Sequence, residues 1–168
     1  DVELIVLASC TFDSMLPNTS SRVQQKLGAK HAACYDINTA CTGFMYALST
    51  ANAMIKTGVV KNAVVIGAET MSQPVPWLDR SLSVLFGDGS AAWVLEASED
   101  GSGIIAERLG CIAEARDILA IDYGFTPPGV PSNHLGSWNF QGQEIFKKAV
   151  NAMAKASVEV LKEAGIKP

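Results

Sequence analysis

Residues 38–44 read Asn-Thr-Ala-Cys-Thr-Gly-Phe, and this stretch decides the fold because it joins a predicted strand to a predicted helix. Before it, Ala32 to Asn38 is typical of a strand, and after it Gly43 to Thr57 carries apolar residues at helical spacing. Cys41 therefore lies at a helix start, where unpaired N–H groups and the helix dipole favour a thiolate. A thiolate is the form of cysteine that attacks a carbonyl carbon.

Two further apolar runs flank this strand and helix, Val2 to Ala8 and Ala63 to Gly67, and each predicts a buried strand. A short helix beginning near Ser20 and ended by Gly28 lies between the first two strands. Alternating strands and helices with short connections predict parallel pairing, so the fold class is α/β. In open α/β sheets ligands bind beyond the carboxyl ends of the strands, which is the edge where Cys41 lies.

After residue 70 the sequence predicts a hairpin, one further strand, a long loop and a final helix. Ser83 to Phe86 and Ser90 to Leu95 are expected to form a hairpin around the Gly-Asp-Gly of residues 87–89. Another strand is expected over Gly103 to Leu109. A long ordered loop follows over residues 122–143, and the chain then enters an amphipathic helix from Gln143 to Ala164 with one apolar side.

Composition excludes several functions. The chain has 168 residues, of which 48% are hydrophobic and 18% charged, and its formal net charge is −4. We therefore expect one globular core and neither a nucleic-acid nor a membrane partner. The four cysteines, in a chain with no signal-like segment, indicate reduced thiols in the cytoplasm. We expect no metal site, because His31 and Cys34 lack a second pair of ligands.

Each candidate residue also has a structural interpretation. From its position alone, Cys41 is also compatible with a small buried residue in a crowded turn, which is how most free cysteines behave. His31 precedes the strand that leads to Cys41 and is expected at the opposite end, while His134 lies in the long loop and cannot be placed, so no general base is evident. Arg80 could meet the phosphates of a nucleotide-like ligand or pair with Asp79 on the surface.

Taken together, these motifs resemble the thiolase-fold condensing enzymes, and most closely the β-ketoacyl-acyl-carrier-protein synthase III family. The resemblance runs along the whole chain and rests on residues 36–44, 46–48, 55–58, 65–69, 79–80, 86–92 and 142–146. It implies a thiolase-like α/β fold, mostly the N-terminal half-domain, with a mixed, largely parallel sheet and helices on its faces. Residues 1–120 would form that half, incomplete at its start. Residues 121–168 would form a tunnel loop and a long helix leading into a missing C-terminal half.

The resemblance also implies roles for particular residues. Cys41 would be the nucleophile that accepts an acyl group, and its backbone N–H would supply half of an oxyanion hole. Arg80 would lie beside the adenine end of coenzyme A, and Leu16 would cap the acyl pocket of a partner across a dimer interface. Two further sets would line the substrate path: Phe140, Gly142 and Gln143 the pantetheine tunnel, and Met71, Phe86 and Trp138 the acyl pocket.

The implied activity is the first condensation of fatty-acid synthesis, between acyl-coenzyme A and malonyl-acyl carrier protein, in a homodimer without a cofactor. The family's catalytic His and Asn belong to motifs that we expect after Pro168, so this chain alone is expected not to condense. Two alternatives remain open: another thiolase-fold condensing enzyme, such as a quinolone- or polyketide-priming synthase, or a non-catalytic dimerisation platform.

Overall fold

The computed structural model describes residues 1–122 and 137–167. The chain divides into two compact units, Asp1–Ile104 and Ile105–Pro168. The division at residue 120, which the resemblance implies between an N-terminal half and a tunnel loop with its helix, stays a prediction.

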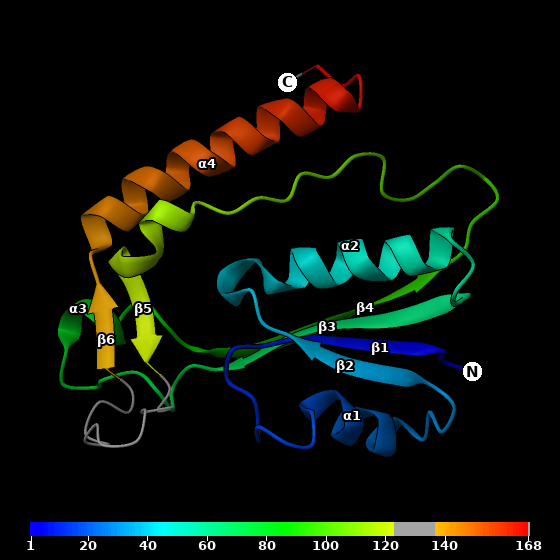
Figure 1. Cartoon of the computed structure of the whole chain (residues 1–168), viewed down its shortest axis with the longest axis horizontal. Coiled ribbons are helices and arrows are strands. Elements are labelled where there is room, and N and C mark those ends of the chain that lie inside the picture. The colour runs from blue at the N-terminus through cyan, green and yellow to red at the C-terminus, as the bar shows by residue number, and fades with distance from the viewer. Residues whose placement is uncertain (123–136, 168) are drawn as a thin grey trace. The chain divides into compact units, whose positions relative to one another are not determined.

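The first unit is built on a four-stranded sheet in the order β2-β1-β3-β4 (Figure 1). Its strands are β1 (Leu4–Ala8), β2 (Ala33–Ile37), β3 (Asn62–Thr70) and β4 (Asp88–Glu96). The strand β1 pairs in parallel with both β2 and β3, whereas β4 runs antiparallel to β3. The sheet is thus mixed and largely parallel, as the resemblance implied.

Two helices cover opposite faces of this sheet, α1 (Thr19–Leu27) on one side and α2 (Gly43–Lys56) on the other (Figure 1). All five residues of β1 are buried, because helices lie on both of its faces. On the α2 side, Ala47, Leu48 and Ala51 pack with Leu4, Val6 and Ala8 in one apolar cluster. The apolar stripe predicted for α2 therefore faces the sheet, and the helix is fixed against the strands that lead to the site.

The end of α1 confirms the stop signal seen in the sequence. Gly28 adopts a left-handed conformation with φ 66°, which glycine takes without a Cβ clash. Its N–H donates to the carbonyl oxygens of Gln24 and Gln25, which would otherwise lack an intrahelical partner. The chain can then turn directly into β2.

Of the two strands predicted around residues 87–89, the second, Ser90 to Leu95, is confirmed as part of β4. The first strand, and with it the hairpin, is wrong. Residues 80–83 form a single helical turn, α3 (Arg80–Ser83), because the Asp79 carboxylate accepts a hydrogen bond from the Ser81 N–H at 2.8 Å and caps it. The Gly-Asp-Gly stretch is no turn either, since β4 begins at Asp88 and pairs with β3. The strand expected over Gly103–Leu109 is also absent from the described residues.

The second unit contains η2 (Ala113–Ile118), β5 (Leu119–Asp122), β6 (Ser137–Phe140) and α4 (Gly142–Glu163). The strands β5 and β6 pair antiparallel, with Leu119 opposite Phe140, so part of the predicted loop is strand. Residues 123–136 lie outside the described part of the chain. Helix α4 matches the predicted helix, but none of its residues is buried, and Phe146 is 70% exposed.

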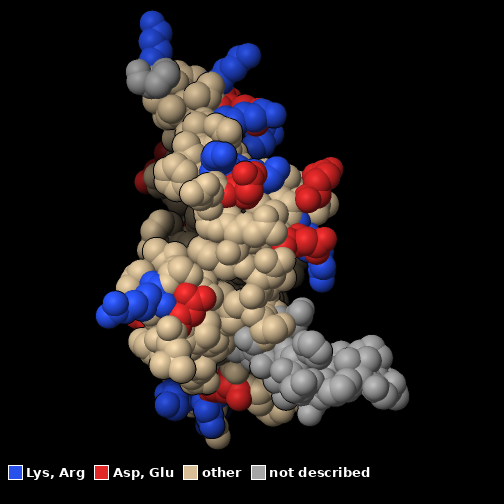
Figure 2. Space-filling model, turned by 90° about the vertical axis from the view of Figure 1, so that its left-hand side faces the viewer, with Lys and Arg blue, Asp and Glu red and all other residues tan. Residues whose placement is uncertain are grey.

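Charges of both signs are interspersed on the face shown in Figure 2, where no large area carries one sign. Among residues 1–122 and 137–167, no helix is long and apolar enough to cross a membrane.

Candidate active site

Cys41 lies in a tight elbow between β2 and α2. The elbow is the 3-10 turn η1 (Ala40–Thr42), which runs directly into α2 at Gly43. Ala40 adopts φ 48°, a left-handed conformation that costs a residue with a Cβ about 1–2 kcal/mol. Local hydrogen bonds hold this turn: the Ala40 N–H donates to Asn38 Oδ1 at 3.1 Å, and Thr42 Oγ1 donates to the Thr39 carbonyl at 2.9 Å.

Close packing beneath the elbow requires glycine. A Cβ on Gly43 would lie 3.1 Å from the Cβ of Ala8 on the central strand. A Cβ on Gly67 of β3 would lie 3.3 Å from the ring of Phe44. Phe44 in turn meets Trp93 of β4 edge to face, with ring centroids 5.2 Å apart. The first turn of α2 therefore lies directly on the sheet, and the elbow opens at the carboxyl ends of β1 and β3.

Cys41 is exposed, so the interpretation of a thiol buried in the core is wrong in this structure. It lines a hollow of about 400 Å³ together with Ala8, residues 67–69 of β3 and residues 89–91 of β4. One acidic side chain, Glu69, contributes to this lining. The hollow gives a ligand access to the sulfur at the edge of the sheet where the sequence predicts a site.

Beside the elbow lies a polar cluster around Glu69 that the sequence reasoning missed. Glu69 Oε1 accepts a hydrogen bond from the Cys10 N–H at 2.8 Å, and Oε2 accepts one from Thr11 Oγ1 at 2.5 Å. The Cys10 thiol also donates to Oε2 at 3.4 Å, and the Thr70 N–H donates to Thr11 Oγ1 at 2.8 Å. These bonds tie the segment that follows β1 to the end of β3, next to the Cys41 hollow.

The Cys10 thiol belongs to this cluster and is held in its protonated form. Burial raises the pKa of the Cys10 thiol to about 12, with the negative charge and the hydrogen bond of Glu69 adding to the effect. Cys10 is therefore a protonated hydrogen-bond donor at neutral pH. Cys10 is half-buried.

Four other predicted site residues belong to the first unit. Met71 is buried just after β3, and Phe86 is half-buried before β4. Leu16, which precedes Pro17, is 80% exposed, and Arg80 is exposed at the start of α3. The predicted Arg80–Asp79 pair is not formed, since the Asp79 carboxylate caps α3 instead.

The remaining predicted residues belong to the second unit. Trp138 and Phe140 lie half-buried on β6, and Gly142 and Gln143 begin α4. A Cβ on Gly142 would lie 3.0 Å from the ring of Phe140, so these two positions are in contact. The pantetheine role implied for them stays a prediction.

Neither histidine supplies a base for Cys41 in the described residues. His31 is exposed in the turn before β2, at the opposite end of that strand from Cys41, as predicted. His134 lies outside the described residues. No group of three or more His, Cys, Asp or Glu side chains in residues 1–122 and 137–167 is arranged to hold a metal ion.

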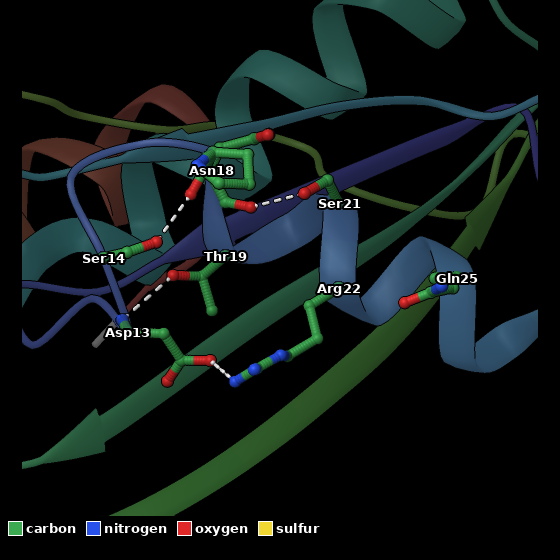
Figure 3. Close-up of a pocket in the computed structure, with 8 residues that line it drawn as sticks. Asp13, Ser14, Asn18, Thr19, Ser21, Arg22 and Gln25 are labelled. Atoms are coloured by element: carbon green, nitrogen blue, oxygen red, sulfur yellow. Dashed lines mark hydrogen bonds and ion pairs between the residues drawn. The ribbon is translucent and has the colours of Figure 1, made fainter.

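A second hollow, of about 490 Å³, lies between the segment after β1 and helix α1 (Figure 3). Its lining is polar and tied together internally: Arg22 forms an ion pair with Asp13 at 2.6 Å, and Ser21 Oγ donates to the Asn18 carbonyl at 2.6 Å. Its lining contains no cysteine, so the Cys41 hollow remains the candidate site.

Comparison with known proteins agrees with this architecture. Residues 35–112 match the family model of 3-oxoacyl-[acyl-carrier-protein (ACP)] synthase III. The chain is 43% identical over 168 residues to Beta-ketoacyl-[acyl-carrier-protein] synthase III 2 of Vibrio cholerae serotype O1, and the match covers 99% of this chain and 46% of that protein.

Solved structures agree as well. The 3-oxoacyl-[acyl-carrier-protein] synthase III from Aquifex aeolicus VF5 matches with a TM-score of 0.89 and 42% identity, over 99% of this chain and 51% of that one. The priming β-ketosynthase from the R1128 polyketide biosynthetic pathway matches with a TM-score of 0.89 and 29% identity, over 99% and 50%. The chain thus spans about half the length of the curated relatives it matches. Over its whole length the chain is therefore similar to proteins of the 3-oxoacyl-[acyl-carrier-protein] synthase III family, and it has their thiolase-like fold.

Proposed function

We propose that the protein to which this chain belongs is a condensing acyltransferase that starts fatty-acid synthesis, and that Cys41 is its acyl-accepting nucleophile. The observation that carries the proposal is the exposed Cys41 on a strained elbow, at the edge of a hollow beyond the carboxyl ends of β1 and β3. Ligands of open α/β sheets bind at this edge.

In the first step the Cys41 thiolate attacks the carbonyl carbon of an acyl-coenzyme A thioester. A bond forms between sulfur and the acyl carbon, and coenzyme A leaves as its thiol. Cys41 lies directly before α2, and helix N-termini present unpaired N–H groups and a positive dipole end. We assign the Cys41 backbone N–H to the oxyanion that develops on the acyl oxygen.

In the second step malonyl-acyl carrier protein loses carbon dioxide, and the resulting carbanion attacks the acyl-cysteine to give a 3-oxoacyl product. The resemblance assigns stabilisation of the enolate to a His and an Asn of other family motifs. We therefore assign the nucleophile and part of the substrate path to this chain, and condensation to the whole protein.

The other roles implied by the resemblance complete the proposal. We assign Arg80 to the adenine end of coenzyme A, and its exposure in the first unit leaves its guanidinium accessible. Met71 and Phe86 would line the acyl pocket with Trp138, and Leu16 would cap the pocket of a second subunit in a homodimer. Phe140, Gly142 and Gln143 would line the pantetheine tunnel. We propose a cytoplasmic enzyme that uses coenzyme A thioester as a substrate and needs no cofactor.

Acyl transfer to the sulfur can be tested without condensation. The purified chain is incubated with acetyl-coenzyme A and longer acyl-coenzyme A esters, and peptide mass spectrometry locates the acyl group. We expect the acyl group on Cys41, and none on that peptide in Cys41→Ser. Cys111→Ser is the matched control, because Cys111 is also exposed but does not lie in a turn that leads directly into an α-helix.

Condensation with malonyl-acyl carrier protein is expected only when the remaining part of the family fold is supplied. Product formation by residues 1–168 alone would contradict the division of roles between this chain and the rest of the protein.

A second candidate is a polyketide-priming synthase, because the R1128 priming β-ketosynthase shares the fold at 29% identity. Both enzymes would acylate Cys41, so the acyl chain decides between them. The discriminating measurement is the relative rate of Cys41 acylation across a panel of primers, repeated with variants at Met71 and Leu16. A strong preference for short straight-chain primers favours fatty-acid initiation, and a preference for unusual or branched starters favours the polyketide role.

A further inference from the structure

A second cysteine, Cys10, approaches the Cys41 elbow from the neighbouring strand. Cys10 follows β1 and Cys41 follows β2, and these strands are parallel neighbours with Ala8 opposite Ile37. Both chains therefore leave the sheet at the same edge. The Ser9 N–H donates to the Ile37 carbonyl at 3.2 Å, which extends the pairing one residue towards Cys10.

The segments that carry the two thiols are closely packed against each other at Ala8 and Gly43. A Cβ on Gly43 would lie 3.1 Å from the Cβ of Ala8, and these residues are each two positions from a cysteine. Glu69 links the pair, because it accepts a hydrogen bond from the Cys10 thiol and lines the hollow with Cys41. A negative charge on Cys41 is also near enough to raise the pKa of Cys10.

The two thiols are suited to different steps of an oxidation. Cys41 is exposed on its hollow and meets a dissolved oxidant first. Cys10 is half-buried and keeps its proton at neutral pH, so it is protected from direct attack. The hydrogen bond from Cys10 to Glu69 provides a carboxylate that can take this proton when the sulfur reacts.

We propose that Cys10 is a resolving thiol that forms a reversible disulfide with Cys41 after a hydroperoxide has oxidised Cys41. In the first step the Cys41 thiolate attacks hydrogen peroxide. An S–O bond forms, the O–O bond breaks and hydroxide leaves, which gives a sulfenic acid. In the second step Cys10 sulfur attacks Cys41 sulfur, the S–S bond forms and the S–O bond breaks. The departing hydroxide takes up the Cys10 proton by way of Glu69 and leaves as water.

The disulfide would protect Cys41 from irreversible oxidation to sulfinic acid, since a sulfenic acid that condenses with a thiol is no longer open to a second peroxide. The cysteine pair does not depend on condensing activity. Only the consequence that the linked form cannot accept an acyl group rests on the proposed function.

Peptide mapping after peroxide treatment tests the pair. The purified chain is treated with hydrogen peroxide, its free thiols are alkylated, and it is digested with trypsin and chymotrypsin, because cleavage after Tyr35 separates Cys34 from Cys41. We expect a Cys10–Cys41 linked peptide that dithiothreitol removes. A disulfide requires Cβ atoms about 3.5–4.5 Å apart, so this peptide also reports that the two segments close over that distance.

Cys10→Ser is the informative variant, because serine can still donate to Glu69. We expect no linked peptide in this variant, dimedone trapping of a Cys41 sulfenic acid, and about tenfold more Cys41 sulfinic acid than in the unmodified chain. Cys34→Ser is the matched control and should form the same Cys10–Cys41 link.

The proposal is overturned if the unmodified chain forms no such link and its Cys41 reaches sulfinic acid as fast as in Cys10→Ser. A link that forms in a chain whose Cys41 accepts no acyl group would contradict the proposed function and leave the cysteine pair standing.

Discussion

Helices α2 and α4 carry similar sequence signals and end in different environments. Both were predicted from apolar residues at helical spacing. In α2, Ala47 and Ala51 are fully buried against the sheet, whereas α4 has no buried residue among those described. An amphipathic pattern thus predicts the helix, and its burial depends on a partner surface. Because the sheet unit supplies that surface for α2, it can hold the Cys41 elbow rigidly.

The largest expected effect on stability comes from shortening an apolar side chain on the face of α2 that is buried against the sheet. Leu48 of α2 is 7% exposed, and Leu48→Ala should destabilise the first unit by about 3 kcal/mol, because the cavity adds to the lost burial. Met153 of α4 is 62% exposed, and Met153→Ala should change stability by less than about 0.5 kcal/mol.

Native-state hydrogen exchange of β1 and α4 amides reports the two units separately. Equal losses from the two substitutions would show that α4 is as firmly packed as α2, and the comparison would fail.

A matched pair of glycines sharpens the contrast at the helix starts. Gly43→Ala places a Cβ 3.1 Å from the Ala8 Cβ, on a buried strand that cannot yield, and should cost about 1–2 kcal/mol. Gly142→Ala meets only the ring edge of Phe140, which can rotate, and alanine favours the helix, so the change should be neutral or slightly stabilising. Urea unfolding of both variants measures the difference. A harmless Gly43→Ala would mean that the elbow is not clamped to β1.

The smallest effect concerns a polar tie within the sheet unit. Asp88 at the start of β4 accepts hydrogen bonds from the Ser72 hydroxyl at 2.6 Å and the Ser72 N–H at 2.7 Å. These bonds, the side-chain one first, lower the pKa of Asp88 below its usual 3.8. The stabilisation is therefore present above pH 3.8 and is lost as the pH falls below it.

Asp88→Asn should flatten the fall in stability below pH 4. Ser72→Ala should do the same, because it removes the hydroxyl that donates to Asp88. Thermal melts between pH 2.5 and pH 6 measure both variants. If stability falls as steeply below pH 4 in the variants as in the unmodified chain, the Ser72–Asp88 hydrogen bonds do not contribute to the pH dependence.

The sequence predicts the first three strands and their helices well, because apolar runs, helical periodicity and Gly28 are local signals. It predicts the strand at Ser90–Leu95 but not its partner. That partner is β3, a strand that precedes β4 by nearly twenty residues, and local turn signals do not reveal such pairing. The Asp79 cap was readable as a helix start, since Asp is one of the preferred N-cap residues.

At the site, the sequence predicts the Cys41 elbow but not the Glu69 cluster. Glu69 meets Cys10 and Thr11 only because β1 and β3 are adjacent, with Ala8 opposite Gly67. A signal was present, since an acid at the carboxyl end of an apolar strand is unusual unless it has partners. Its partners could be named only once the strand order was known.

The measurement that tests the central claim most directly is competitive alkylation of the four thiols with limiting iodoacetamide near neutral pH, resolved by peptide mass spectrometry. Cys41 and Cys111 are both exposed, but only Cys41 lies in a turn that leads directly into a helix at the edge of a sheet. The account predicts that Cys41 is labelled first, Cys111 more slowly and the protonated Cys10 last. Equal labelling of Cys41 and Cys111 would contradict an activated nucleophile and favour a non-catalytic platform.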